Sequence, residues 1–343
     1  MSPVSAGVSP FDRYQRGHPW VGFPLAVLYK TLDDRAPRLA AMLTYYAFAS
    51  LFPLMLLFSS IVGFVLDGDP SLRHHLTRTV AGALPGIGTQ LAGSITGFGG
   101  SGAALAVGVL GVLYGALGAT TAAQSALNQI YGVPRFRQPD PLRSRVRALG
   151  LLALLGLFVM VSTGVAAVVS TANGLSGQLG PWVRAGGYVL TYVLDAALFT
   201  IAYQLLTAVG LAWRDVAVGG LVAGAAWELV QTLGSLYIAH ELSHSTALYG
   251  SFGVIVAALA WIYLQALALV VAAEINVVRQ QRLWPRALSS QWASDFEPTP
   301  ADQVVYRMYL EGSRMKPFEE VGVVYRPAGP PGAGGTPPSG GCC

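Results

Sequence analysis

Six long apolar segments dominate the pattern of hydrophobic and polar positions along this chain of 343 residues. A helix needs roughly 17 to 25 mostly apolar residues to cross a bilayer, and no segment shows the period-2 alternation of an outer-membrane strand. The pattern therefore predicts an all-α, polytopic membrane protein with six transmembrane helices. The predicted spans are Leu39–Leu66, Ala103–Leu127, Ala148–Val169, Gly187–Leu211, Val216–Ile238 and Phe252–Ala273.

The polar segments around these spans divide the chain into three predicted regions. Residues 1–23 form a cytoplasmic N-terminal segment, residues 24–282 the membrane domain, and residues 283–343 a cytoplasmic, largely disordered Gly/Pro-rich tail. The run PWVGFPLAVLYK is expected to lie on the membrane surface as an amphipathic segment, and ADQVVYRMYLEG to form a short helix within the tail. Cys342 and Cys343 end the tail, where no disulfide framework or CxxC metal site is expected.

Composition supports the prediction of a membrane protein, and the distribution of Lys and Arg predicts how the chain is oriented across the membrane. The chain is 53% hydrophobic and 11% charged, whereas soluble domains carry about 25% charged residues. Of its 21 Lys and Arg residues, 18 flank the spans on one side and three on the other. Basic flanks stay inside, so both termini are predicted to be cytoplasmic in a bacterial inner membrane. Topology and contact with anionic lipid headgroups account for the pI near 9.1, so no nucleic-acid partner is implied.

Two carboxyl groups, Asp195 and Glu228, fall within predicted spans four and five. A short connection makes these spans an antiparallel hairpin, which places the two groups within about 7 Å of each other along the membrane normal. No Lys or Arg lies within any span, so burial should favour the protonated forms. Together with Gln231, Thr232 and Ser235 on span five, the pair predicts an intramembrane proton or headgroup site. The alternative is a neutral, hydrogen-bonded pair that only locks the bundle.

The first span contains the unusual stretch TYYAFASLFPLMLL. Pro53 lacks an amide hydrogen and crowds the carbonyl of Ala49, so the helix is expected to break or kink there, with Ser50 helping to satisfy the freed backbone groups. Tyr45 and Tyr46 either belong to an interfacial aromatic belt or face a polar interior.

A stripe of four glycines on one face of the second span predicts close helix packing, with a glycine-lined path or hinge as the alternative. These residues are Gly108, Gly111, Gly115 and Gly118.

Two further polar groups lie near the ends of spans. Glu274 and Asn276 are predicted at the cytoplasmic rim, where Glu274 is expected to be an interfacial anchor, with a functional carboxyl as the alternative. The sequence HELSH matches the HExxH zinc pattern through His240, Glu241 and His244. This match is short, lies at a helix end and lacks a clear third ligand, so no metal site is assigned.

Several separate motifs, in order, resemble the YihY/BrkB family of bacterial inner-membrane proteins. They are LAAMLTYYAFASLFPLMLL, ALNQIYGV, AWELVQTLGSLY and LYGSFGVIVAALAWIYLQALALVVAAEINV, and the resemblance covers about Pro24 to Arg282. It implies six spans but no settled activity. The label ribonuclease BN attached to the family is regarded as mistaken, the name virulence factor comes from serum resistance, and movement of lipids or lipid-linked envelope precursors has been suggested. HELSH lies outside the motifs.

The leading functional hypothesis is a transporter or flippase-like protein for a lipid or lipid-linked envelope component, proton-linked through Asp195 and Glu228. One alternative is a noncatalytic envelope-assembly scaffold, and a minor one is a membrane-edge zinc metalloprotease. No enzyme activity and no cofactor are expected, because cytoplasmic carboxylates that a nuclease would need are scattered. Membrane lipids are the expected partners, and a homo-oligomer is compatible with the pattern.

Overall fold

The computed structural model describes residues 10–65, 102–172, 180–244, 250–287 and 298–323, and these contain helices but no strand. Two short helices precede the long ones, and one short helix follows them. In chain order the helices are α1 (Pro10–Gly17), α2 (Pro19–Asp33), α3 (Ala36–Val65), α6 (Gly102–Ile130), α7 (Pro141–Ala172), α8 (Gly180–Leu206), α9 (Trp213–His244), α10 (Gly250–Gln281) and α11 (Pro300–Ser313).

Five of these helices, α6 to α10, are long and apolar enough to cross a membrane. They coincide with predicted spans two to six, so the multi-pass helical class is confirmed. The first predicted span coincides with the 30-residue helix α3. A total of six spans and the orientation of the termini stay predictions.

The hairpin between α8 and α9 turns earlier than predicted. Helix α8 ends at Leu206 and α9 already begins at Trp213, so the connection is 207–212. A contact with another helix occurs at this point: the Ala208 amide donates to Asn128 Oδ1 of α6 at 2.8 Å.

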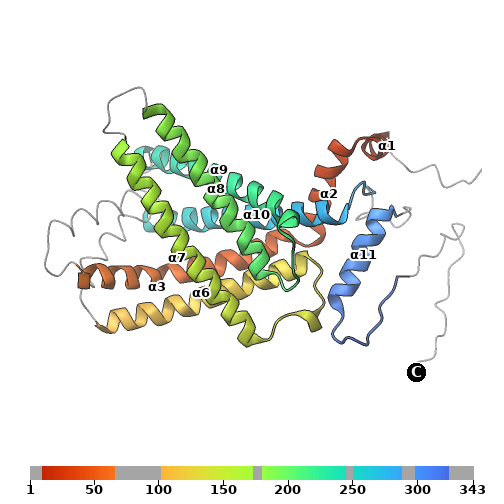
Figure 1. Ribbon diagram of the computed structural model, residues 1–343, viewed down its shortest axis with the longest axis horizontal. Helices are drawn as coiled ribbons and strands as arrows, with labels where there is room; N and C mark the ends of the chain where they lie inside the picture. The colour runs from red at the N-terminus through yellow and green to blue at the C-terminus, as the bar shows by residue number, and fades with distance from the viewer. Residues whose placement is uncertain (1–9, 66–101, 173–179, 245–249, 288–297, 324–343) are drawn as a thin grey trace, which may run out of the picture.

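The long helices pack as a connected bundle (Figure 1). Helix α3 lies along α6, α8 lies along α9, and α10 contacts both α3 and α9. Helix α7 contacts α6 and α8. The short helices α1, α2 and α11 gather at one end of the bundle, where α6 and α10 also end. We call this the predicted cytoplasmic end.

The glycine stripe of α6 is a packing surface for α3. Every one of three glycines faces one α3 residue so closely that an added Cβ atom would come within 2.8 Å of it. The pairs are Gly111 with Pro53, Gly115 with Ser50, and Gly118 with Tyr46. Close helix packing, the first of the two predicted roles, is therefore what these three glycines do.

The predicted interruption of the first span at Pro53 is wrong, whereas a kink there stays a prediction. Helix α3 continues through Pro53 to Val65, and the proline ring packs against the bare backbone at Gly111. Ser50 donates to the carbonyl of Ala47 at 2.7 Å.

The two tyrosines of this stretch differ in their surroundings. Tyr45 is 67% exposed, whereas Tyr46 packs against Gly118 of α6. Tyr45 thus suits the aromatic-belt interpretation.

The chain after Arg282 joins the same core as the long helices. The predicted tail helix is confirmed as α11, which starts with a capping box between Thr299 and Asp302. Leu283, Val305 and Met308 all belong to the hydrophobic cluster built mainly from α6, α8 and α10. The prediction of a separate tail from residue 283 is therefore corrected as far as α11. Cys342 and Cys343 lie outside the described residues.

Candidate functional site

A buried ionic cluster lies where α2, α6, α10 and α11 meet. Lys30 and Glu274 are fully buried and Asp34 is 2% exposed. The Lys30 ammonium contacts Asp34 Oδ2, lies 3.3 Å from Glu274 Oε2, and donates to the carbonyl of Ile130 at 3.2 Å. The ring of Tyr309 lies 5.5 Å from it. A lysine held by four segments of the chain is the centre of this end of the bundle.

Local sequence explains why Lys30 points inwards. It follows Gly22, Ala26 and Val27 on the buried face of α2, and the carboxyl of Asp34 lies one turn further on. Helix α6 ends at Ile130, which leaves a carbonyl there without a helical donor and available to Lys30.

Asn276 extends this cluster towards α9. Its Oδ1 atom accepts a hydrogen bond from the Gly219 amide at 2.6 Å, and a Cβ at position 219 would lie 2.5 Å from the Ala272 carbonyl. Only glycine permits this approach. Burial raises the pKa of the neighbouring Tyr131 hydroxyl, and burial beside Asp34 likewise raises the pKa of Tyr309. Both phenols are therefore neutral at physiological pH.

We define the Lys30 cluster as Lys30, Asp34, Tyr131, Glu274, Asn276 and Tyr309. Five of its buried polar atoms have no hydrogen-bond partner within the described part of the chain, although Tyr131 lies close to Asn276 and Tyr309 close to Asp34. These atoms are Asp34 Oδ1, Tyr131 Oη, Glu274 Oε1, Asn276 Nδ2 and Tyr309 Oη. The side chains of the Lys30 cluster thus lie next to one another as one buried polar network.

The prediction that Glu274 is an interfacial anchor is wrong. An anchor must reach the membrane surface, but the side chains of Glu274 and Asn276 are both 0% exposed. Helix α2 packs against α10 and brings Lys30 onto Glu274. Glu274 and Asn276 therefore lie inside the protein, at the predicted cytoplasmic end of the bundle.

A second ion cluster joins α11 to the end of α2. The Arg286 guanidinium lies 2.7 Å from Asp33 and 2.9 Å from Asp302. Burial by itself would lower the pKa of Arg286, but the two carboxylates more than offset this and raise it. Asp302 also accepts from the amide of Ala287 and the hydroxyl of Thr299. These contacts fix α11 against the bundle.

The predicted carboxyl pair does meet in the structure. Asp195 of α8 is 3% exposed, and its side chain interacts with that of Glu228 of α9. The backbones approach because a Cβ at Gly224 would lie 3.1 Å from the Ala196 amide nitrogen. Asp195 Oδ2 has no hydrogen-bond partner among the described residues.

The other residues of the predicted stripe are less closely tied to this pair. Thr232 is exposed, and its hydroxyl donates to the Glu228 backbone carbonyl at 2.9 Å. Gln231 is half-buried. The side chain of Ser235 lies outside the described residues. The structure therefore supports Asp195 and Glu228 as a pair but adds no further member to it.

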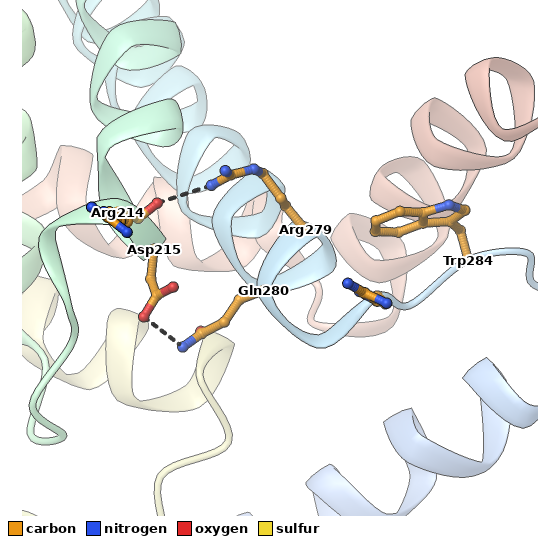
Figure 2. A pocket seen from close by; sticks show the side chains of 6 residues that line it. Arg214, Asp215, Arg279, Gln280 and Trp284 are labelled. Atoms are coloured by element: carbon orange, nitrogen blue, oxygen red, sulfur yellow. Dashed lines mark hydrogen bonds between the residues drawn. The ribbon is translucent and has the colours of Figure 1, made fainter.

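Two of the hollows on the described surface are candidate binding sites. One, the α3–α10 groove, has a volume of about 420 Å³ and a mostly apolar lining of Ala41, Thr44, Tyr45, Val256, Leu259, Ala260 and Tyr263. The other, the arginine pocket, has a volume of about 660 Å³ and is lined by Arg214, Asp215, Arg279, Gln280, Arg282 and Trp284 (Figure 2). Neither lining includes Asp195 or Glu228.

The HELSH segment occupies the last turns of α9, which ends at His244. Helical spacing puts His240 and His244 one turn apart, but the side chains of His240, Glu241 and His244 lie outside the described residues. Among described side chains, no group of three His, Cys, Asp or Glu residues could hold a metal ion. The zinc site stays an untested prediction.

Sequence reasoning missed the Lys30 cluster, although a signal was present. Lys30 is four residues after Ala26 and four before Asp34, so helical spacing places it on the apolar face of α2 with an acidic neighbour. Its position at the end of the apolar run PWVGFPLAVLYK is equally typical of a charge that flanks a membrane segment. The partner Glu274 is 244 positions away in sequence, and helical spacing carries no information at that distance.

Comparison with known proteins gives a consistent family match. The family model described as Virulence factor BrkB matches residues 27–295. A UPF0761 membrane protein of Paraburkholderia xenovorans is 26% identical over 250 residues, covering 68% of this chain and 54% of the relative. Similar proteins of the same description occur in Ralstonia nicotianae, at 27% identity over 72% of this chain and 57% of the relative, and in Aromatoleum aromaticum, at 28% over 71% and 60%.

This chain thus spans less than two thirds of the length of these relatives. No solved structure matches it.

Proposed function

The chain belongs to the Virulence factor BrkB family of membrane proteins, and from this premise we propose that it moves a lipid or lipid-linked envelope component across the membrane. In this proposal it is a transporter or flippase-like protein of the bacterial inner membrane, with six spans and both termini in the cytoplasm. Protons drive or gate the movement through Asp195 and Glu228.

The observation that carries the proposal is the carboxyl pair between α8 and α9. Ionisable groups at membrane depth are costly and mark ion or substrate pathways by default. Asp195 is almost fully buried, faces Glu228 and keeps one oxygen without a partner in the described chain. Two adjacent carboxyl groups disfavour double ionisation, so this pair can exchange a proton with a change in local charge.

The α3–α10 groove supports a lipid as the cargo. Its lining is mostly apolar, with the hydroxyl-bearing residues Thr44, Tyr45 and Tyr263 among aliphatic side chains. An acyl chain is complementary to the aliphatic part. The groove faces outwards between two long helices, so a lipid could enter from the side without leaving the bilayer.

The test compares lipid movement by reconstituted protein with and without the titratable pair. Asp195→Asn combined with Glu228→Gln keeps the size of both side chains and removes both ionisable groups. Movement of a fluorescent phospholipid between leaflets, measured in proteoliposomes from pH 5.5 to 8.5, should lose its pH dependence in this double variant. The rate should also fall, because neither residue can then take up or release a proton.

Asp140→Asn is the matched control, because Asp140 is an exposed carboxyl in the connection before α7. It should behave like the unaltered protein. Equal rates for all three proteins at every pH would refute proton linkage, and a rate equal to that of protein-free liposomes would refute lipid movement.

A noncatalytic scaffold is the second candidate, and one observation favours it. Neither hollow is lined by Asp195 or Glu228, while the Lys30 and Arg286 clusters hold helices together by buried ion pairs. A scaffold predicts no lipid movement and a loss of thermal stability when the carboxyl pair is neutralised.

A further inference from the structure

The arginine pocket is built from the beginning of one long helix and the end of another. Arg214 and Asp215 are the second and third residues of α9, and Arg279 and Gln280 lie in the last turn of α10. Figure 2 shows these two pairs side by side, with Trp284 on the far side of Arg279. The Arg279 guanidinium donates to the Arg214 carbonyl at 2.9 Å, and the Gln280 amide donates to Asp215 at 3.3 Å.

The pocket carries a net positive charge, and its arginine side chains are exposed. Three guanidinium groups stand against one carboxylate in the lining, which leaves a net charge of +2. Arg214, Arg279 and Arg282 are all exposed, and no ion pair joins any of them to a carboxylate in the described part of the chain. Asp215 is instead occupied by Gln280. The pocket therefore has unneutralised positive charge for an anion.

The position of the pocket indicates which anion it meets. Both α9 and α10 are long and apolar enough to cross a membrane, so residues at their ends lie at the level of lipid headgroups. Trp213 is 53% exposed beside the pocket, and Trp284 forms part of its lining. Tryptophan is enriched at this level. A soluble anion would not require these flanking tryptophans.

We propose that the arginine pocket binds the phosphodiester headgroup of an anionic phospholipid in the adjacent leaflet, the predicted cytoplasmic one. Guanidinium groups bind phosphate oxygens through paired, charge-assisted hydrogen bonds, and basic pockets between membrane helices on the cytoplasmic side recognise anionic headgroups. The Arg279–Arg214 bond makes such a lipid a link across the α9–α10 contact. The inference does not depend on lipid transport.

The experiment measures lipid binding to the purified full-length protein by native mass spectrometry. Dioleoyl phosphatidylglycerol and dioleoyl phosphatidylcholine are titrated in parallel, and sn-glycerol 3-phosphate is added as a soluble competitor. The pocket variant carries Arg214→Gln, Arg279→Gln and Arg282→Gln. The control variant carries Arg38→Gln, Arg143→Gln and Arg145→Gln, which removes the same charge from exposed arginines at the same end of the bundle.

The expected result is tighter binding of phosphatidylglycerol than of phosphatidylcholine, with a loss of at least about tenfold in the pocket variant and little change in the control. The pocket variant loses its charge-assisted hydrogen bonds to the phosphate, whereas Arg38, Arg143 and Arg145 lie outside the pocket lining. Arg214→Gln alone leaves the Arg214 carbonyl and thus its bond to Arg279 intact, so it should weaken binding less than the triple change does, without unfolding.

Equal losses in the pocket and control variants would overturn the proposal, because diffuse attraction would then suffice. Efficient displacement of the lipid by glycerol 3-phosphate would overturn it in favour of a soluble phosphate ligand. Because binding is measured without any translocation, a failure here is separate from a failure of the transport assay.

Discussion

Lys30 is the residue whose surroundings differ most from what its sequence position implies. A lysine at the end of an apolar run normally extends its ammonium group to water, but this one is fully buried between two carboxylates. The desolvation penalty for buried ion pairs is large, and removing one partner leaves an uncompensated charge. Lys30, Asp34 and Glu274 are therefore interdependent, and together they join α2 to α10.

Replacing Lys30 with methionine should destabilise the protein strongly. The change leaves Asp34 and Glu274 buried without their cation, which costs roughly 3–5 kcal/mol in comparable cases. The melting temperature in detergent, followed by size-exclusion chromatography after heating, should fall clearly. Adding Asp34→Asn and Glu274→Gln to Lys30→Met should recover most of the loss, because the site is then neutral.

Glu311→Gln provides the control for this series. It removes an ion pair with Arg314 in which the carboxyl side chain is 40% exposed, and such surface pairs contribute about 0–1 kcal/mol. If Lys30→Met melts no lower than Glu311→Gln, the ion cluster does not hold the helices together.

At the level of elements, the α3–α6 contact shows how glycines on one helix allow close packing of another helix. Three glycines of α6 pack against a proline, a serine and a tyrosine of α3. The approach is so close that a side chain in place of any of these glycines would clash. Pro53, whose ring packs on Gly111, lies within a continuous helix. Close backbone approach is a main source of association between membrane helices.

Gly115→Ala should weaken this contact. Its methyl group would lie 2.7 Å from the Ser50 Cβ and 3.0 Å from its Cα, and overpacking of this kind costs about 1–3 kcal/mol. We expect a lower melting temperature, partly restored by Ser50→Gly because that change removes the nearer atom. Gly156→Ala is the matched control, since no atom lies within 4 Å of its added methyl group and alanine favours the helix by up to about 1 kcal/mol. A lower melting temperature for Gly156→Ala than for Gly115→Ala would contradict this account.

On the scale of the whole molecule, segments from both ends of the described chain close one end of the bundle. Helix α2 brings Lys30 and Asp33, and the segment around α11 brings Asp302 and Tyr309, to the ends of α6 and α10. The hydrophobic cluster is continuous through this region. These contacts agree with the predicted topology, in which both ends of the chain lie on one side of the membrane; that topology stays a prediction.

The two cysteines of the chain allow this orientation to be tested. Cys342 and Cys343 are its only cysteines, and the charge asymmetry predicts that they are cytoplasmic. A membrane-impermeant maleimide should not label these two cysteines in intact spheroplasts, and it should label them once the spheroplasts are permeabilised. Ser176→Cys, placed between α7 and α8 in a Cys342→Ser, Cys343→Ser background, should label in intact spheroplasts. The reverse labelling pattern would invert the predicted topology.

Much of the architecture could be predicted because it depends on local sequence. Long apolar runs determined the membrane helices, since burying a run in lipid requires only its own length and composition. The proximity of Asp195 and Glu228 also followed, because a short hairpin fixes the relative depth of its two helices. The continuity of α3 through Pro53 could not be predicted from the local sequence, because the groups that compensate for a proline within a membrane helix can come from neighbouring helices.

The sequence by itself thus determined the class of protein, the family, the helices and one carboxyl pair, all of which follow from spacing within a helix or hairpin. Only the tertiary structure decided that Lys30 meets Glu274, that α11 completes the core, and that Arg214 lies beside Arg279. Lys30 and Glu274 are 244 positions apart in the sequence, and Arg214 and Arg279 are 65 positions apart. Their physical reason is side-chain fit and charge pairing between helix faces, which helical periodicity within one segment does not specify.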